Sequence, residues 1–158
     1  MTSLRIFFLV SLLVALDQIS KYWITSNLYL GSSLEVLPFL NFTLIFNTGV
    51  AFSMFDDGGS LGRWTLVAVT FIAITYVAYV LYKEKELHIL ETLPLTMILS
   101  GGLGNLVDRV LLGHVIDFIH VFYAGYSFYV FNLADSFITI GVVIYIYYLI
   151  FLDKKRST

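Results

Sequence analysis

Long apolar segments separated by polar connections dominate the chain and predict four membrane-spanning helices. A helix rises about 1.5 Å per residue, so a segment of about 20 residues crosses a hydrocarbon core of about 30 Å. The first segment continues into the polar residues 17–21 instead of ending at a small-residue cleavage site, which favours a retained helix over a cleaved signal peptide. The predicted spans cover approximately residues 4–24, 61–82, 89–112 and 134–152.

The pattern changes in two segments between the spans. Residues 39–55 are rich in Phe, Leu, Ile, Val and Thr with rough alternation, which predicts short strands in a small sheet at the membrane surface. Residues 115–131 are aromatic and β-branched around Gly125, which predicts a hairpin or an extended interfacial segment. We therefore expect one all-α membrane domain over residues 1–158, with four transmembrane helices and a small external β-rich part.

The basic residues near the span ends predict the orientation, because cytoplasmic loops carry the excess of Lys and Arg. In the four-span arrangement, six basic residues near the span ends fall on one side: Arg5, Lys83, Lys85, Lys154, Lys155 and Arg156. Only Arg63 clearly falls on the opposite side. Both termini are expected in the cytoplasm, which makes residues 27–62 and 115–131 external.

Composition supports the membrane class and excludes several functions. The chain is 59% hydrophobic, and its net charge of -2 without a basic block argues against nucleic-acid binding. Without cysteine it has no disulfide, thiolate nucleophile or thiolate metal site. His88, His114 and His120 have no zinc-site spacing, and no His-Glu-x-x-His motif occurs, so neither a metal nor another cofactor is expected.

Polar residues gather in the second half of the third span, where ionisable groups are costly and often functional. Counted from Gly101, residues Asn105, Asp108 and Arg109 fall at i+4, i+7 and i+8 and share one helix face. Glycine at Gly101 and Gly104 allows a neighbouring helix to approach closely. These residues therefore form either a buried network that locks helices together or a functional site, and the sequence leaves both open.

Asp117 follows the third span, and Asp135 begins the fourth. The topology therefore brings both carboxyl groups to the same depth at the external interface. Two neighbouring carboxylates can share one proton, one acting as base and the other as acid, as in aspartic proteases. Asp135 is predicted to ionise more readily because a helix N-terminus favours its anion. The structural alternatives are an ordinary interfacial acid at Asp117 and a helix cap in which Asn132 precedes Asp135 by three residues.

Other functions remain as alternatives at this point. Asp17, Asp108 and Asp135 could serve a proton relay in a small proton-coupled transporter or channel subunit, although four spans without inverted repeats make that harder to build. A purely structural or lipid-binding scaffold would leave the interfacial carboxylates unexplained. Lys21 is expected to snorkel to the interface or to pair with Asp17.

Five blocks in order along nearly the whole chain resemble the lipoprotein signal peptidases, or signal peptidase II, a bacterial inner-membrane family of aspartic proteases. Departures are small: Ser20 stands where the family often has Thr, and Ile116 where Val is usual. The blocks are DQISK at 17–21, NTGVAFS at 47–53, GGLGNLVDR at 101–109, VIDF at 115–118 and FNLADS at 131–136.

The resemblance implies that Asp117 and Asp135 are the catalytic dyad and that Asp108 is a structural partner of Arg109. It also implies that the two external segments form a cradle and a lid. Substrate-binding or supporting roles are implied for Asp17, Lys21, Asn47, Gly49, Asn105, Asp108, Arg109, Asn132 and Ala134.

The implied substrates are prolipoproteins whose cysteine carries diacylglyceryl, cleaved just before that cysteine. We expect the enzyme to be a monomer surrounded by lipids of the bacterial inner membrane, with its active site near the external face. A lipid-anchored cysteine would hold the scissile bond near the membrane surface, which is the depth predicted for both carboxylates.

Overall fold

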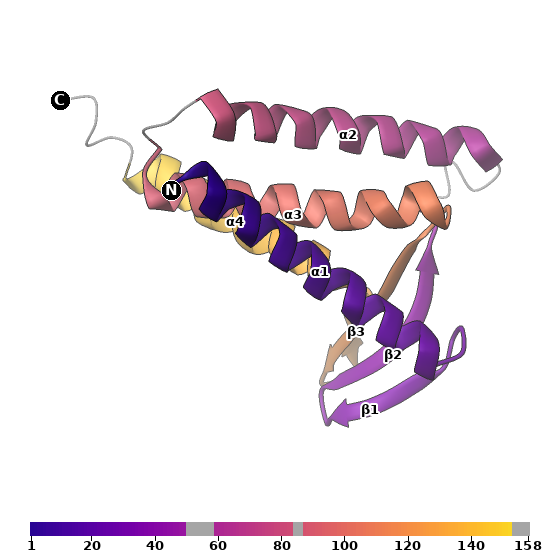
Figure 1. Ribbon diagram of the computed structural model, residues 1–158. Coiled ribbons are helices and arrows are strands. Elements are labelled where there is room, and N and C mark those ends of the chain that lie inside the picture. The colour runs from indigo at the N-terminus through magenta and orange to yellow at the C-terminus, as the bar shows by residue number, and fades with distance from the viewer. Residues whose placement is uncertain (50–58, 84–86, 153–158) are drawn as a thin grey trace.

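The computed structural model describes residues 1–49, 59–83 and 87–152 (Figure 1). Four helices in it are long and apolar enough to cross a membrane, which confirms the four predicted spans. They are α1 (Ser3–Asn27), α2 (Gly59–Lys83), α3 (Ile89–Leu111) and α4 (Leu133–Phe151). Some predictions concern residues outside the described ranges. They are the end of the predicted strand segment at 50–55, the end of the block at 47–53, and the basic residues Lys85, Lys154, Lys155 and Arg156.

Helix α3 is the central helix and packs against α1, α2 and α4. Figure 1 shows α2 beside α3 and α1 crossing the other helices obliquely. Glycines permit the close approach of α3 and α4: a Cβ atom at Gly101 would lie 2.3 Å from the Ala134 carbonyl oxygen, and one at Gly141 would lie 2.7 Å from that of Pro94. Both distances are too short for a side chain, so α3 and α4 pack backbone against backbone at these points.

The buried face of α3 carries polar groups that are satisfied within the helix. The hydroxyls of Thr92, Thr96 and Ser100 donate to carbonyl oxygens four residues earlier, at 3.1, 2.6 and 2.7 Å. At the start of α3, the His88 backbone N–H donates to Glu91 Oε2 at 2.8 Å, and the Leu90 N–H donates to His88 Nδ1. These bonds let a polar helix occupy the centre of the bundle, because a buried hydroxyl without a partner is costly.

A four-stranded antiparallel sheet extends from one end of the helices, in the order β1-β2-β3-β4. Its strands are β1 (Ser33–Leu37), β2 (Leu40–Asn47), β3 (Val115–Tyr123) and β4 (Tyr126–Ser127). The hairpin predicted within residues 115–131 is confirmed: Ala124 and Gly125 form its turn with positive φ angles of 50° and 83°, as a two-residue hairpin turn requires. The two predicted external segments are thus one sheet, joined by β2 and β3.

A small apolar core holds this sheet against the end of α1. Ile24 of α1 packs with Leu44, Ile116 and Phe118 of the sheet, and all four side chains are buried. The ring of Phe42 lies edge-on to that of Phe118, with their centroids 5.7 Å apart. The core fixes β2 and β3 beside the end of α3 and the start of α4, where the candidate residues lie.

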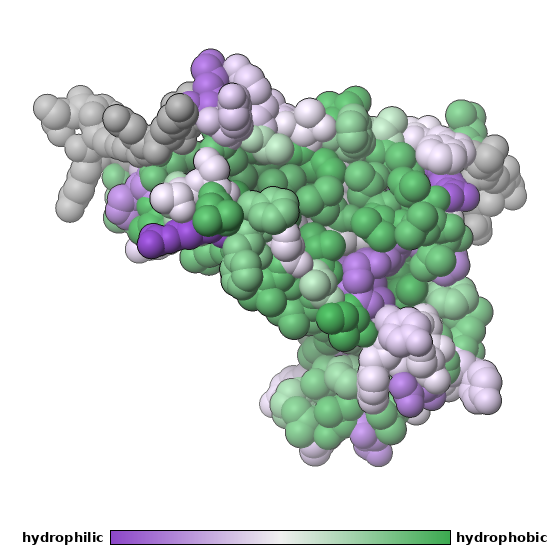
Figure 2. Space-filling model, viewed as in Figure 1, coloured by the Kyte–Doolittle hydropathy of each residue, from purple (hydrophilic) through white to green (hydrophobic). Residues whose placement is uncertain are grey.

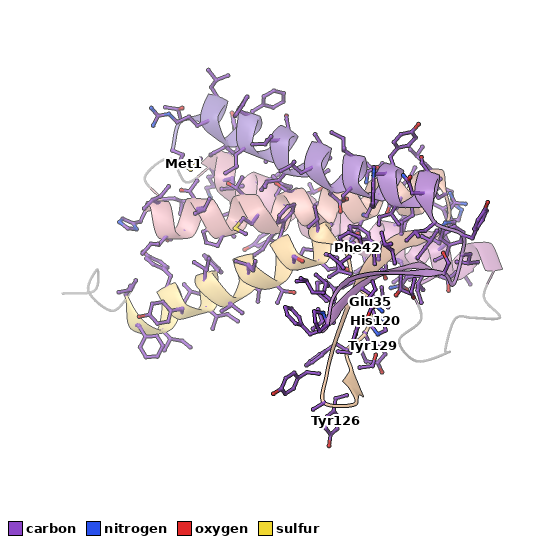
Figure 3. All side chains as sticks on the ribbon, turned by 90° about the horizontal axis from the view of Figure 1, so that it is seen from below. Met1, Glu35, Phe42, His120, Tyr126 and Tyr129 are labelled. Carbon is purple, nitrogen blue, oxygen red and sulfur yellow. The ribbon has the colours of Figure 1, made fainter. Side chains whose placement is uncertain are left out.

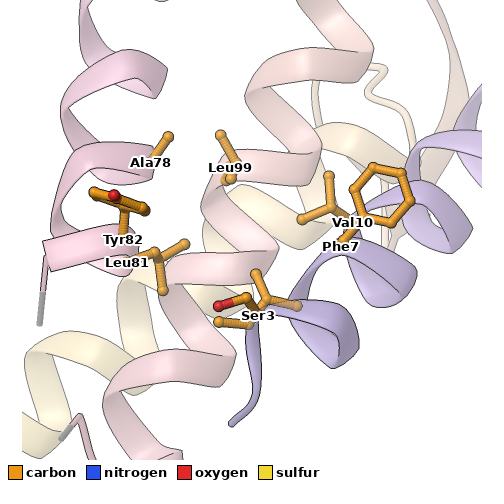
Figure 4. Close-up of a pocket in the computed structure, with 8 residues that line it drawn as sticks. Ser3, Phe7, Val10, Ala78, Leu81, Tyr82 and Leu99 are labelled. Carbon is orange, nitrogen blue, oxygen red and sulfur yellow. The ribbon is translucent and has the colours of Figure 1, made fainter. Parts of the chain in front are cut away.

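The outer surface of the helices is largely apolar, as Figure 2 shows for one face. At the end of the bundle away from the sheet, α1 and α2 leave an apolar cavity of about 250 Å³ over α3 (Figure 4). Its walls include Phe7 of α1, Leu81 of α2 and Leu99 of α3, and no carboxylate lines it. The described lining of this cavity is mostly apolar, and the candidate residues lie at the opposite end, beside the sheet.

Candidate active site

Asp117 is buried in β3 and is held by two amide side chains. Gly113, with φ of +87°, turns the chain from α3 into β3, which places Asp117 beside the end of β2. Asn47 Nδ2 donates to Asp117 Oδ2 at 2.8 Å, and Asn132 Nδ2 donates to Asp117 Oδ1 at 2.6 Å. The carboxyl group is therefore fixed from two sides by neutral donors.

Asp135 lies in the first turn of α4 and forms a capping box with Asn132. The Asp135 N–H donates to Asn132 Oδ1 at 2.9 Å, and the Asn132 N–H donates to Asp135 Oδ2 at 3.3 Å. The predicted helix cap is thus present. It leaves Asp135 Oδ1 to accept from Asn105 Nδ2 at 2.7 Å. A cap and a reactive group are compatible here, because one carboxylate has two oxygens.

Asn132 and Asn105 connect the two carboxyl groups. Asn132 contacts Asp117 through its side chain and Asp135 through its backbone, and its Nδ2 also lies 3.2 Å from Asn105 Oδ1. The structure therefore brings together Asp117, Asp135, Asn47, Asn105 and Asn132, all named from the sequence. Asp117 and Asp135 are also near enough to interact electrostatically.

The surroundings of Asp117 favour its protonated form. Burial, as the main cause, raises its pKa to about 6, and the negative charge of Asp135 raises it as well. The hydrogen bonds from Asn47 and Asn132 and the charge of Lys21 act in the opposite direction without cancelling these effects. Asp117 therefore keeps its proton to a higher pH than an exposed aspartate does.

A second cluster of charged residues lies buried between α1 and α3. Lys21 Nζ is 2.8 Å from Asp17 Oδ2, 2.9 Å from Asp108 Oδ2 and 3.1 Å from Asn105 Oδ1. Lys21 therefore pairs with Asp17, one of its two predicted roles. Asp108 forms its ion pair with Lys21, and it also interacts electrostatically with Arg109, the partner that the resemblance implied.

This Asp17–Lys21–Asp108 cluster holds the segments that carry the two carboxyl groups. Asp17 Oδ1 accepts from the N–H of the buried Ala134 at 3.0 Å, in the first turn of α4. Asp108 Oδ2 accepts from the Ile116 N–H at 3.2 Å, next to Asp117. The cluster thus ties α1 and α3 to the start of α4 and to β3.

Arg109 and Gly49 complete the set of predicted site residues. Among the described residues Arg109 Nε is buried without a hydrogen-bond partner, and the guanidinium interacts electrostatically with Asp135 and Asp117. Gly49 has a φ of +95°, and its N–H donates to Asn47 Oδ1 at 2.8 Å, which orients the amide that contacts Asp117. Arg109 is thus a cation near both carboxyl groups without forming a salt bridge in the described part of the chain.

Two further residues support the site and were not singled out from the sequence. Gln18 Nε2 donates to Asp108 Oδ1 at 2.9 Å, and its place in the block at 17–21 was the available signal. Arg63 donates to the carbonyl oxygens of Arg109 and Val110 at 2.8 and 2.5 Å, so it caps the end of α3. Within the described residues no group of three or more His, Cys, Asp or Glu side chains is placed to hold a metal ion.

Fold and site together define a multi-pass membrane protein with a coupled pair of carboxyl groups at one end of its helices. Residues 9–151 match the model of the family described as signal peptidase (SPase) II, and the chain belongs to this family. Membership makes it a bacterial membrane protease.

Curated relatives and solved structures agree with this assignment. The chain is 40% identical to a lipoprotein signal peptidase of Acinetobacter baumannii over 146 residues, which cover 92% of this chain and 82% of the relative. It is 42% identical to one of Streptococcus pyogenes over 137 residues, 84% of each chain. A solved bacterial membrane enzyme, determined by the in meso method at 2.3 Å resolution, matches with a TM-score of 0.84 and 33% identity over 98% of this chain and 92% of that one. The matches support a signal peptidase, and nothing in them supports the transporter or channel alternative.

Proposed function

We propose that this chain is an aspartic endopeptidase that removes signal peptides from prolipoproteins, with Asp117 and Asp135 as its catalytic dyad. The observation that carries the proposal is the pair itself: two carboxyl groups coupled electrostatically and bridged by Asn132, without a salt bridge to either in the described residues. The names of the family and the relatives support the substrate class. The scissile bond is the one before the cysteine that carries diacylglyceryl.

The pair begins the reaction with one proton. Because burial favours the protonated form of Asp117, Asp117 is the acid and Asp135 the base in the proposed cycle. Asp135 removes a proton from water while the water oxygen attacks the peptide carbonyl carbon, and Asp117 gives its proton to the carbonyl oxygen. When the tetrahedral intermediate collapses, its C–N bond breaks, Asp135 gives its proton to the leaving nitrogen, and Asp117 recovers a proton from the hydroxyl.

The neighbouring polar residues orient the pair and the peptide. Asn105 and Asn132 hold the carboxyl groups, and the guanidinium of Arg109 lies close enough to both to stabilise negative charge on the carbonyl oxygen. Asn47, Asn105, Arg109 and Asn132 hydrogen-bond to the substrate backbone or shape the site. Asp17, Lys21 and Asp108 act through position, because their polar atoms are engaged with each other and with the backbone.

The dyad lies at the external face in this proposal. Arg5 and Lys83 are at the bundle end away from the sheet, so the positive-inside rule puts that end in the cytoplasm. The lipid-anchored cysteine then reaches the dyad from the outer leaflet. The enzyme works as a monomer in the inner membrane, because both carboxyl groups come from one chain.

Substitution of each carboxyl group tests the proposal. Asp117→Asn and Asp135→Asn, purified in detergent, are each expected to release signal peptide from a diacylglyceryl-modified precursor about 10²- to 10⁴-fold more slowly. Glu35→Gln is the matched control, because Glu35 is exposed on β1 and is expected to leave the rate unchanged. Substantial turnover by either folded Asn variant would overturn the dyad, and equal cleavage of an unlipidated precursor would overturn the substrate assignment.

A further inference from the structure

A row of polar side chains crosses all four strands of the sheet. Ser33 Oγ lies 2.8 Å from Thr43 Oγ1, Thr43 Oγ1 lies 3.3 Å from His120 Nδ1, and His120 Nε2 lies 2.6 Å from Ser127 Oγ. Each strand contributes one member, and the proposed chemistry uses none of them. Many other side chains of the sheet are apolar and exposed, so this continuous row of hydrogen-bonded polar side chains needs an explanation.

The row ends in the cavity that contains Asp117. This cavity has a volume of about 580 Å³, and His120 and Ser127 line it together with Asp117 and Asn47. Tyr129, which also lines it, lies near His120 where the hairpin of β3 and β4 projects from the helices (Figure 3). The His120–Ser127 pair therefore faces the same space as a carboxyl group of the dyad.

A different cavity adjoins the other carboxyl group. It has a volume of about 370 Å³ and is lined by Asp135 together with Phe131, Ser136, Thr139 and Ile140, mostly from the first turns of α4. Most of its lining thus belongs to α4, a helix long and apolar enough to cross a membrane. The Asp117 cavity is formed by the sheet, outside the four spans.

The two cavities match the two ends of a precursor. Its signal segment is apolar and stays in the membrane, whereas the chain after the scissile bond continues into water. We propose that the His120–Ser127 cavity binds the segment that follows the scissile bond, and that His120 and Ser127 are substrate-binding residues that hydrogen-bond to its backbone. The inference rests on the proposed function, because it takes the scissile bond to lie at the dyad.

The chemistry of the pair suits peptide binding. A serine hydroxyl has one donor and two acceptor positions, so the exposed Ser127 can bond to a peptide group while it stays bonded to His120. Thr43 contacts one ring nitrogen of His120 and Ser127 contacts the other. Because the imidazole is already held in place, its side chain loses less conformational entropy when a peptide binds. An extended peptide presents backbone N–H and C=O groups whatever its sequence, so such contacts tolerate many different mature proteins.

The same pair does not form a second nucleophilic site. Its Oγ–Nε2 distance of 2.6 Å matches that of a serine activated by histidine. In that arrangement a carboxylate on Nδ1 stabilises the imidazolium. Here Nδ1 contacts the Thr43 hydroxyl, which carries no charge to do so.

Two substrates of different length test the assignment. One precursor ends at the lipidated cysteine as an amide, and the other continues for several residues beyond it. His120→Ala and Ser127→Ala are each expected to raise KM for the long substrate about fivefold, the effect of one hydrogen bond, with kcat nearly unchanged. The short substrate should be cleaved by both variants as by the parent enzyme, and His120→Gln should restore part of the affinity for the long one.

The controls separate this inference from the proposed function. Tyr126→Ala, next to Ser127 but outside the cavity lining, should leave both substrates unaffected. Equal losses on both substrates, unchanged KM for the long one, or no preference of the parent enzyme for length would each overturn the subsite. Failure of the parent enzyme to cleave either lipidated substrate would instead overturn the proposed function.

Discussion

Two groups of aspartates, buried except for the half-buried Asp135, lie close together at the sheet end, and they differ in what balances their charge. Asp17 and Asp108 have Lys21 between them, with Nζ–O distances of 2.8 and 2.9 Å. Asp117 and Asp135 are linked through amide groups, and neither forms a salt bridge within the described residues. In the first group both carboxyl groups share one ion-paired lysine and serve as a support, whereas the second group has no such ion pair and keeps the capacity to exchange a proton.

The difference follows from the cost of burying charge. A salt bridge offsets part of the cost of burying a carboxylate, whereas the neutral amide donors around Asp117 leave burial as the main influence on it. Burial accordingly raises the pKa of Asp117 to about 6. The residues that contact each carboxyl group therefore distinguish the supporting aspartates from the proposed catalytic ones better than depth in the membrane does.

Removal of the cation from the first group is expected to have the largest effect on stability. Lys21→Met leaves Asp17 and Asp108 buried without their shared counterion and should lower the free energy of unfolding by about 3–5 kcal/mol. Unfolding in detergent, followed by the loss of tryptophan fluorescence, measures this. Lys83→Met at an exposed site is the matched control and should change stability little. A Lys21→Met protein as stable as the parent would contradict the structural role.

A smaller loss of stability is expected when a side chain is added next to the Asp17–Lys21–Asp108 cluster. A Cβ atom at Gly104 would lie 2.5 Å from Asp17 Oδ2, so Gly104→Ala must displace the carboxylate that accepts from the Ala134 N–H. The expected cost is about 1–3 kcal/mol. Because both changes disrupt one cluster, Gly104→Ala and Lys21→Met together should cost less than the sum of the single effects. Full additivity in the double variant would show that Gly104 acts elsewhere.

The smallest predicted effect is a shift in the pH dependence of kcat/KM when a residue that contacts Asp117 is replaced. If protonated Asp117 is required, kcat/KM falls as pH rises through about 6, the pKa of this group. Asn47→Ala removes a hydrogen bond that lowers this pKa, so the alkaline limb should move to higher pH by a fraction of a unit. Thr48→Ala should leave the limb in place. A limb that moves to lower pH in Asn47→Ala would contradict the assignment of Asp117 as the acid.

The raised pKa also links the folding stability to pH. In the unfolded chain Asp117 returns to its ordinary value of 3.8, so it releases its proton there before it does so in the folded chain. Its contribution to stability is therefore complete below about pH 4 and is lost as the pH rises through about 6.

The sequence predicted the spans and the local motifs because both depend on short-range patterns. Mainly apolar segments of spanning length marked the four helices, and the spacing of Asn132 and Asp135 marked the cap of α4. The sequence did not predict the ion pair of Asp108 with Lys21, because Lys21 lies on another helix, far away along the chain.

Long-range pairing accounts for the rest of what the sequence did not predict. The first segment between the spans was predicted as strands and the second as a hairpin or extended segment, but no local pattern indicated that Ile45 of β2 pairs with Asp117 of β3. The contact of His120 with Ser127 and Thr43 depends on the same register, so His120 gave no sign of a role in the sequence.

Four Asp→Asn variants, at positions 17, 108, 117 and 135, test the contrast between the two groups most directly. For each variant, signal-peptide release and the free energy of unfolding are measured in the same detergent and at the same pH. The account predicts that Asp117→Asn and Asp135→Asn lose cleavage with stability near that of the parent. Asp17→Asn and Asp108→Asn should lose stability, while their folded fraction still cleaves. Cleavage by either dyad variant, or a stable Asp17→Asn or Asp108→Asn protein without activity, would contradict it.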